Sequence, residues 1–514
     1  MNALFNLVDE PWIPCVDIRH GRHQELSIRE VLARSHELQE IDDPSPLVTI
    51  SLYRLLLAIL HRNFGPEDEE GWRKLRQRGA WDAATLNSYF GNPDRYYRFD
   101  LFGEQPFYQS ASLDIAAPEP ISLLAHELAS GNNATLFDHT SDARAPAVSP
   151  AQAACYLVAY HGFAFGGRIT GESEPGKFGP LIKGALVLVR GTSLFETLLL
   201  NLHQYSHEYE EPWSMEHDDC PAWECAEETQ ARSRLPRGYL DLLTWQSRRV
   251  RLIPERDDTG QIVVRFVVVR KGYWFPEDFH RRNAETMVAF SFSEKPGTGG
   301  DPYPPVLLQQ DRAVWRDSHA LFTPSEESRR PKMLDWLNRL ANHGCLERHE
   351  IRYIDVFGLC TVPGKAKAIL WRHERLPLPL VYLNDKELRD SLKQALDLAN
   401  AAAGDLNESV KHLATVLRTP DLAKSLAPTR AFWTYIEADF LQYLRDATAN
   451  RRAAFSAWCD AISLATRRAF IEAVRGYDTS ARLLQATVTA ERVLNGRLRR
   501  TIERYRPFEQ GDAA

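Results

Sequence analysis

Two pairs of potential metal ligands stand out in the sequence, but neither has the partners that metal chemistry requires. His203 and His207 are four residues apart, a spacing that places two imidazoles on one face of a helix. The glutamate of a catalytic HExxH motif is absent, because Gln204 follows His203. Cys220 and Cys225 have no second cysteine pair to complete a tetrahedral site. We therefore interpret both pairs as structural and predict no metal ligands.

Other catalytic signatures are missing as well. The sequence contains no GxxxxGK(S/T) phosphate loop and no GxSxG nucleophile elbow. The acidic clusters at residues 67–70 and 208–211 have no evident metal-site partners. A metal-dependent nuclease, which needs several carboxylates around its metal, stays open as an alternative. The sequence otherwise predicts no catalytic residues, no cofactor and no enzyme activity.

A polar segment, GNNATLF, offers a different kind of chemistry. Gly131 permits unusual backbone angles, and Asn132 and Asn133 tolerate left-handed turns. Asparagine side chains can donate to and accept from base edges or phosphates, and Phe137 can stack on a base. The alternative is an ordinary asparagine-rich turn with Phe137 in the core.

Glycines and lysines are concentrated in the segment GESEPGKFGPLIKG, residues 171–184. Glycines such as Gly179 and Gly184 let a backbone approach DNA closely. Lys177 and Lys183 can meet phosphates at the same place. The alternative is a flexible surface loop.

The pair Arg270-Lys271 ends a strand rich in β-branched residues and precedes Gly272. A long cation at a strand end can reach into the minor groove, where base pairs offer a degenerate pattern of acceptors. Such a readout would tolerate several DNA sequences. The alternative is a solvated lysine at a turn.

The elements that must position these residues change character along the chain. In the first part, short strand-like and helical segments alternate without a regular βαβ rhythm, which favours an α+β body. We predict strands at Ile262–Val269 and Ala185–Gly191, a helix at Leu194–His207 and a buried helix at Leu47–Leu60.

The last part of the sequence is helical in pattern. Apolar residues recur at helical spacing in five stretches, which begin at Leu388, Leu406, Trp433, Phe455 and Leu484. Gly404, the Ala427-Pro428 pair and Gly476 are the expected breaks. Successive amphipathic helices must bury their apolar stripes against one another, so we predict a helical bundle.

Length and charge are consistent with two domains, predicted at residues 1–376 and 377–514. A chain of 514 residues is too long for one ordinary core. Its net charge is −7, yet the part from Pro428 onward has 14 arginines, no lysine and 10 acidic residues. This basic end suggests a local polyanion contact, or else a solvated arginine-rich helix face. Seven scattered cysteines show no disulfide framework and fit a reducing cytoplasm, and the longest apolar stretch is too short for a membrane span.

Five further segments carry a resemblance to a known family. They are FNLVDEPWIP (5–14), RFDLFGEQPFYQ (98–109), VRGTSLFETLLLNL (189–202), GYLDLLTWQSRRVRL (238–252) and DRAVWRD (311–317). Their order and spacing, with GNNATLF, resemble the CasA family, the large subunit of the type I-E CRISPR Cascade complex. The resemblance covers nearly the whole chain. It implies a large mixed α/β N-terminal domain followed by a C-terminal four-helix bundle.

The resemblance also implies a function and partners. A CasA-like protein is a non-catalytic subunit that recognises the protospacer-adjacent motif in double-stranded DNA, promotes R-loop formation and recruits a helicase–nuclease. Its partners are target DNA, the guide RNA-bound backbone, small and 5′-handle-binding subunits, and that helicase–nuclease. We expect a cytoplasmic protein that is monomeric when isolated and has no membrane partner. A purely architectural subunit that never contacts DNA is the remaining alternative.

Individual residues follow from the same resemblance. Asn133 and Phe137 match positions that contact DNA or guide, residues 171–184 match a glycine loop, and Lys271 matches a lysine finger. The segment VPGKAKAILWRH resembles a hairpin whose tip is a wedge under the first base pair, with lysines where the family often has Gln or Asn. The predicted DNA-binding residues are Asn132, Asn133, Phe137, Gly179, Lys183, Gly184, Arg270, Lys271, Lys365 and Lys367.

Overall fold

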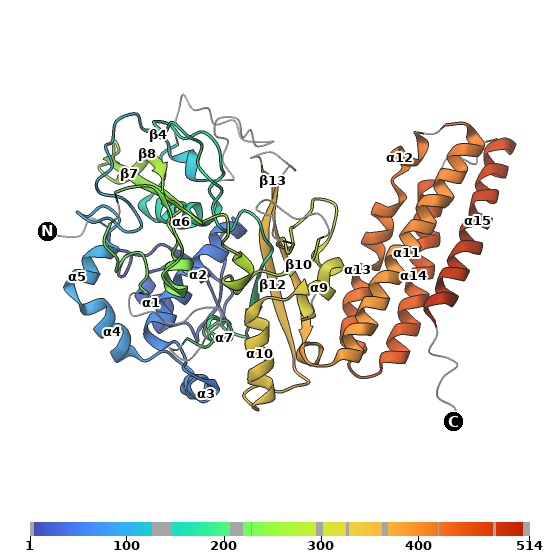
Figure 1. Cartoon of the computed structure of the whole chain (residues 1–514), viewed down its shortest axis with the longest axis horizontal. Coiled ribbons are helices and arrows are strands. Elements are labelled where there is room, and N and C mark those ends of the chain that lie inside the picture. Colours follow the sequence, from blue (N-terminus) through green and yellow to red (C-terminus); the bar gives the residue numbers. More distant parts are fainter. Residues whose placement is uncertain are drawn as a thin grey trace. The chain divides into compact units, whose positions relative to one another are not determined.

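The computed structural model describes residues 5–125, 146–205, 219–227, 229–293, 302–324, 328–361, 368–419, 421–475 and 480–506 (Figure 1). By its internal contacts the chain divides into two compact units. Unit 1 comprises Met1–Arg312, Pro324–Leu346 and Tyr353–Arg375, and unit 2 comprises Ala313–Thr323, Glu347–Arg352 and Leu376–Ala514. Two segments that precede residue 376 therefore belong with the C-terminal helices.

The elements of unit 1 mix helices and strands, in agreement with the predicted α+β class. Its helices are α1 (Ile28–Ala33), α2 (Pro46–Phe64), α3 (Glu69–Arg78), α4 (Ala83–Gly91), α5 (Pro93–Tyr96), α6 (Pro150–Phe163), α7 (Leu194–Leu200), α8 (Tyr239–Leu243) and α10 (Lys332–Asn342). The strands of the chain are β1 (Ile13–Asp17), β2 (His23–Leu26), β3 (Leu38–Ile41), β4 (Glu119–Pro120), β5 (Leu186–Arg190), β6 (Arg232–Ser233), β7 (Arg248–Arg256), β8 (Ile262–Lys271), β9 (Tyr273–Trp274), β10 (Phe290–Ser291), β11 (Ser328–Arg329), β12 (Ile351–Thr361) and β13 (Ala368–Pro379).

The strands form small sheets instead of one continuous sheet. Within the described residues, three sheets have three strands each, in the orders β2-β1-β3, β13-β12-β5 and β4-β8-β7. β5 runs antiparallel to β12, with Arg190 opposite Tyr353. β7 and β8 form a long antiparallel hairpin, in which Arg248 lies opposite Lys271 and Val250 opposite Val269.

Both predicted strands are confirmed, whereas the predicted helix at Leu194–His207 is wrong in its second half. The helix α7 ends at Leu200. The side chain of Asn201 ends it, because its amide nitrogen donates to the carbonyl oxygens of Thr197 and Val189, each at 2.7 Å. The side chain of Asn201 thus links the last turn of α7 to β5, and the chain leaves the helix. His207 lies outside the described residues.

The predicted buried helix at Leu47–Leu60 is confirmed as the core of α2. Pro46 occupies the first turn of α2, where its missing N–H costs no hydrogen bond. Residues 47–61 are buried on every face of this helix, so it packs in the interior. Among the described residues α2 is the one helix long and apolar enough to cross a membrane, and 83% of its most apolar stretch is buried inside the protein.

Unit 2 is a helical bundle of four long helices. They are α11 (Lys386–Leu417), α13 (Pro428–Asp446), α14 (Arg451–Ala473) and α15 (Ala481–Tyr505). The short α12 (Leu422–Leu426) connects α11 to α13, and the short α9 (Ser318–Phe322) packs against α11. The core contains Trp458 of α14, whose indole N–H donates to the carbonyl of Ala395 at 3.0 Å. The Ala427-Pro428 break is confirmed, because α13 begins at Pro428.

The predicted break at Gly404 is wrong. The helix α11, which is 32 residues long, continues through Gly404 without a break. A side chain added at this glycine would meet open space. A glycine inside a helix costs about 1 kcal/mol relative to alanine, which the buried apolar stripe of α11 outweighs. The break predicted at Gly476 lies outside the described residues.

Candidate nucleic-acid interface

Two of the predicted DNA-facing residues, Arg270 and Lys271, lie at the open end of the β7–β8 hairpin. Buried valines and leucines hold one face of this hairpin in the core. At the far end the chain turns at Gly260, whose φ of +83° suits glycine. At the open end, pairing continues past Lys271, because the backbone N–H of Gly272 donates to the carbonyl of Ser247 at 3.2 Å. Arg270 and Lys271 are therefore held on a rigid strand.

The glycine-rich segment folds back on itself beside this strand end. Gly167 and Gly176 exchange two backbone hydrogen bonds, at 3.0 and 2.7 Å. A Cβ on Gly176 would lie 2.5 Å from the side chain of Ile169, so only glycine fits without rearrangement. Residues 167–176 therefore form a closed loop, which contains only the first part of the predicted segment 171–184 and which we call the glycine loop.

Arg248 pins the glycine loop to the hairpin. Its buried guanidinium donates to the carbonyl oxygens of Phe165 at 2.6 Å, Lys177 at 2.7 Å and Ser247 at 2.8 Å. Burial lowers the pKa of Arg248, and the carbonyl oxygens satisfy the charge in place of a carboxylate. Sequence reasoning missed this residue. Its only signal was its place within the strand-like motif at 238–252.

Lys271 is held by two carboxylates of the glycine loop. Its ammonium lies 3.6 Å from Glu174 and 3.8 Å from Glu172, and only 15% of the side chain is exposed. The backbone N–H of Lys271 also donates to Glu172 at 3.1 Å. The side chain of Arg270 packs over Gly171, where a Cβ would lie 3.1 Å from the guanidinium carbon. The structure thus brings the predicted cations and the glycine loop together.

The remaining described candidates lie just after the loop. Gly179 is buried, and its N–H donates to the carbonyl of Ala164 at 2.7 Å. Gly184 is also buried, with a φ of +148°. Lys183 is exposed, and its ammonium lies 5.2 Å from the ring centroid of Phe178. The roles of all three in DNA binding stay predictions.

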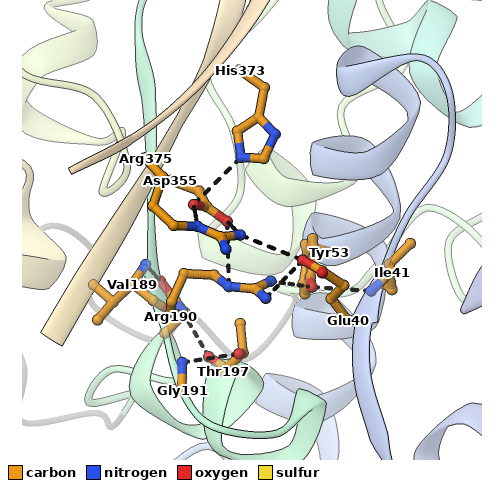
Figure 2. A network of polar contacts seen from close by, with 11 residues as sticks. Glu40, Ile41, Tyr53, Val189, Arg190, Gly191, Thr197, Asp355, His373 and Arg375 are labelled. Atoms are coloured by element: carbon orange, nitrogen blue, oxygen red, sulfur yellow. Dashed lines mark hydrogen bonds and ion pairs between the residues drawn. The ribbon is translucent and has the colours of Figure 1, made fainter. Parts of the chain in front are cut away.

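A second polar network ties β12 to β13, the strands on either side of the predicted wedge segment, which lies outside the described residues (Figure 2). Asp355 accepts hydrogen bonds from Arg375 at 2.7 and 3.1 Å. Asp355 also lies 3.3 Å from Arg190 and 3.3 Å from His373. Arg190 forms a further ion pair with Glu40 at 2.7 Å. Strands β3, β5, β12 and β13 are thereby tied together.

Several predicted residues lie outside the described residues. They are Asn132, Asn133, Phe137, Lys365 and Lys367, so their contribution to an interface stays a prediction.

The two pairs considered as metal ligands have other environments. The ring of His203 is buried and lies 4.7 Å from that of His61, and burial lowers the pKa of His203 to about 4. Cys220 and Cys225 form a disulfide, which the scattered cysteines did not predict. Their Cα atoms are 6.2 Å apart, within the range that a disulfide spans. Within the described part of the chain, no three His, Cys, Asp or Glu residues are grouped as metal ligands would be.

Comparisons with known proteins define the class of this molecule. The family model of the CRISPR-associated protein Cse1 matches residues 6–469. The CRISPR-associated protein CasA/Cse1 of Thermus thermophilus is 34% identical over 95% of this chain and 96% of its own. The crystal structure of Thermobifida fusca Cse1 superposes with a TM-score of 0.84 at 25% identity, covering 97% of this chain and 98% of that one. The fold is also shared with a chain of a solved CRISPR RNA-guided surveillance complex, with a TM-score of 0.78 at 22% identity over 96% of this chain and 99% of that one.

These matches place the molecule among the CRISPR-associated proteins of known fold. The chain belongs to the Cse1 (CasA) family. The family resemblance predicted from the sequence is therefore confirmed, and so is the mixed α/β body followed by a helical bundle.

Proposed function

We propose that this chain is the subunit of a cytoplasmic RNA-guided surveillance complex that recognises the protospacer-adjacent motif in double-stranded DNA. In this role it promotes R-loop formation beside the motif and presents a surface to a helicase–nuclease, without catalysis of its own. Family membership supports the class of complex. The placement of Lys271 beside the glycine loop supports the contact with DNA.

The open end of the β7–β8 hairpin has the features that a minor-groove contact needs. A cation is held at the end of a rigid strand, and glycines nearby leave room for close approach of a DNA backbone. Exposed cations at Arg168, Lys177 and Lys183 lie in the glycine loop or follow it in the sequence, and they can meet phosphates. The groove offers Lys271 acceptors that replace Glu172 and Glu174.

The test is binding of target duplex by the complex that lacks its large subunit, with and without this chain. Wild-type chain should restore tight binding to duplexes with an intact motif and not to those with a scrambled motif. Lys271→Ala should remove this preference while assembly stays intact. Lys74→Ala is the matched control, because Lys74 is an exposed lysine on α3 of the same unit.

A second variant tests the carboxylates that hold Lys271 and not the lysine itself. Glu174→Gln removes one of the two carboxylates that hold Lys271 and leaves the lysine in place. It should strengthen binding to motif-bearing duplexes. Equal binding to both duplexes by the wild-type chain would indicate an architectural subunit. Cleavage of DNA by the purified chain with Mg²⁺ or Mn²⁺ would indicate a nuclease.

A further inference from the structure

A polar pocket lies beside the hairpin, where Gln246, just before β7, and Tyr273 of β9 form part of its wall. Its cavity volume is about 40 Å³. Its lining comes from residues 98–109, 222–227 and 234–246, together with Tyr273. Three arginines, Arg98, Arg234 and Arg237, share this pocket with the carboxylates of Asp241 and Glu227.

The two carboxylates are already engaged within the protein. Asp241 accepts two hydrogen bonds from Arg234, at 2.5 and 2.9 Å. Glu227 accepts from the backbone N–H groups of Ala111 and Ser112, at 3.2 and 3.1 Å. Arg234 is further enclosed by aromatic rings, with its guanidinium carbon 4.0 Å from the centroid of Tyr273. The charge of Arg234 is therefore neutralised before any ligand arrives.

The other two arginines keep donors available. The Nε of Arg237 is buried and has no hydrogen-bond partner. Its nearest carboxylate oxygen, on Asp241, is 3.7 Å from Nη2. The side chain of Arg98 makes no hydrogen bond or ion pair with any residue that the structure describes. The side chain of Arg237 is 37% exposed and Arg98 is half-buried, so an anion can reach both guanidinium groups.

The chemistry of these donors matches a phosphate group. Arginine guanidinium groups bind the oxygens of phosphates in a planar, forked geometry that a single lysine does not provide. The pocket is also continuous with the proposed interface, because Gln246 and Tyr273 on its wall pair through a backbone hydrogen bond of 3.0 Å at the same hairpin end as Lys271. This continuity favours a nucleic-acid strand over an acidic peptide.

We propose that this pocket binds one phosphodiester group of a single-stranded nucleic acid, with Arg98 and Arg237 as its ligands. The inference rests on the proposed function for the presence of such a strand near the hairpin. Arg98 is the residue to test, because it has no structural partner to lose, whereas Arg237 also donates to Cys225 at 3.0 Å.

The experiment measures binding of fluorescein-labelled dT12 and rU12 to the purified full-length chain by anisotropy over a series of salt concentrations. Arg98→Gln should weaken binding roughly three- to tenfold and reduce the slope of log affinity against log salt by about 0.7, the value for one phosphate on a single strand. Arg98→Lys should restore part of the affinity. Arg19→Gln is the matched control, since Arg19 is an exposed arginine of the same unit outside the pocket.

Two outcomes would overturn the proposal. One is an equal effect of Arg98→Gln and Arg19→Gln on affinity and slope. Arg98 would then contribute only its positive charge and would not bind a phosphate in the pocket. The other is the absence of oligonucleotide binding while inorganic phosphate alone stabilises the wild-type chain and not Arg98→Gln, which would make the pocket a free-anion site.

The result is separable from the test of the proposed function. Loss of motif preference is measured with Lys271→Ala on duplex DNA in the complex. If that preference is absent while the Arg98 effect on single strands persists, the recognition role fails and the pocket stands. If the preference is present and the Arg98 effect is absent, only the pocket fails.

Discussion

Replacement of Asp355 by asparagine tests whether the buried network in Figure 2 stabilises unit 1. Asparagine keeps the size of the side chain and removes its charge. Arg190 and Arg375 would then face each other with Glu40 as their one remaining carboxylate among the residues of this network. Asp355 is only 1% exposed, so water cannot enter its position and solvate the arginines that lose their carboxylate partner.

The size of the effect follows from the burial of the partners. Removal of one member of a fully buried ion pair costs about 3–5 kcal/mol. Arg190 is 8% exposed, whereas the side chains of Arg375 and His373 are 44% and 36% exposed and remain partly solvated. We therefore expect Asp355→Asn to lower the free energy of unfolding by about 3 kcal/mol, the lower end of that range.

Urea denaturation followed by circular dichroism at neutral pH measures this loss. Glu255→Gln is the matched control, because Glu255 pairs with Arg265 at 2.6 Å while both side chains are about 40% exposed. An exposed pair of this kind contributes less than about 1 kcal/mol. If Asp355→Asn costs no more than Glu255→Gln, the network does not stabilise unit 1 and the reasoning is refuted.

The same pair of proteins has a defined pH dependence. Burial raises the pKa of Asp355, but hydrogen bonds from His373 and Arg375 and the charge of Arg190 outweigh it, so the pKa lies below its ordinary value. A carboxyl with a lowered pKa in the folded state stabilises the protein above the unfolded pKa of about 4, and this contribution is lost as the pH falls further. The difference between wild type and Asp355→Asn should therefore shrink below about pH 4.

Three further predictions concern other parts of the fold. Gly272→Ala should lower stability by about 1–3 kcal/mol in thermal unfolding, because its Cβ would lie 2.4 Å from the carbonyl oxygen of Gln246 and backbone atoms cannot move aside. Burial lowers the pKa of His203 to about 4, so the unfolded chain takes up a proton that the folded chain does not as the pH falls below about 6.5. From pH 7 to pH 5 the free energy of unfolding should therefore fall by roughly 1–2 kcal/mol less in His203→Gln than in the wild type. Trp458→Ala should cost about 3–5 kcal/mol in unfolding of the bundle, whereas Leu464→Ala, on the same helix and 72% exposed, should change little.

Elements with strong local patterns could be predicted from the sequence. The β-branched run at Ile262–Val269 has a preference for strand, and β8 contains all of it. The apolar periods of the last part require helices, and unit 2 has them. The end of α7 could not be predicted, because it depends on the hydrogen bond from the side chain of Asn201 to the carbonyl of Val189 on strand β5.

The sequence allows some residues of the candidate site to be predicted, but it does not allow their contacts with one another to be predicted. The sequence marks Lys271 as a cation at a strand end and gives no indication that Glu172, 99 residues earlier, accepts from its backbone. Arg248 looks like any arginine in a strand motif, yet its guanidinium donates to the carbonyl oxygens of the distant residues Phe165 and Lys177. Such contacts depend on how loops close in space, which local patterns do not encode.

The ion pairs of Lys271 have a consequence for the effect of ionic strength. A solvated lysine that meets a phosphate releases the cations condensed along the nucleic acid, and affinity then falls steeply as salt rises. The charge of Lys271 is already neutralised by Glu172 and Glu174 before DNA binds. When the ammonium binds DNA instead, these two carboxylates lose their partner and lie beside the phosphates. These carboxylates draw cations back, so the exchange is nearly neutral in counterions. Salt should therefore govern how often the chain meets DNA through the exposed Lys177 and Lys183, while the discrimination made by Lys271 stays nearly constant.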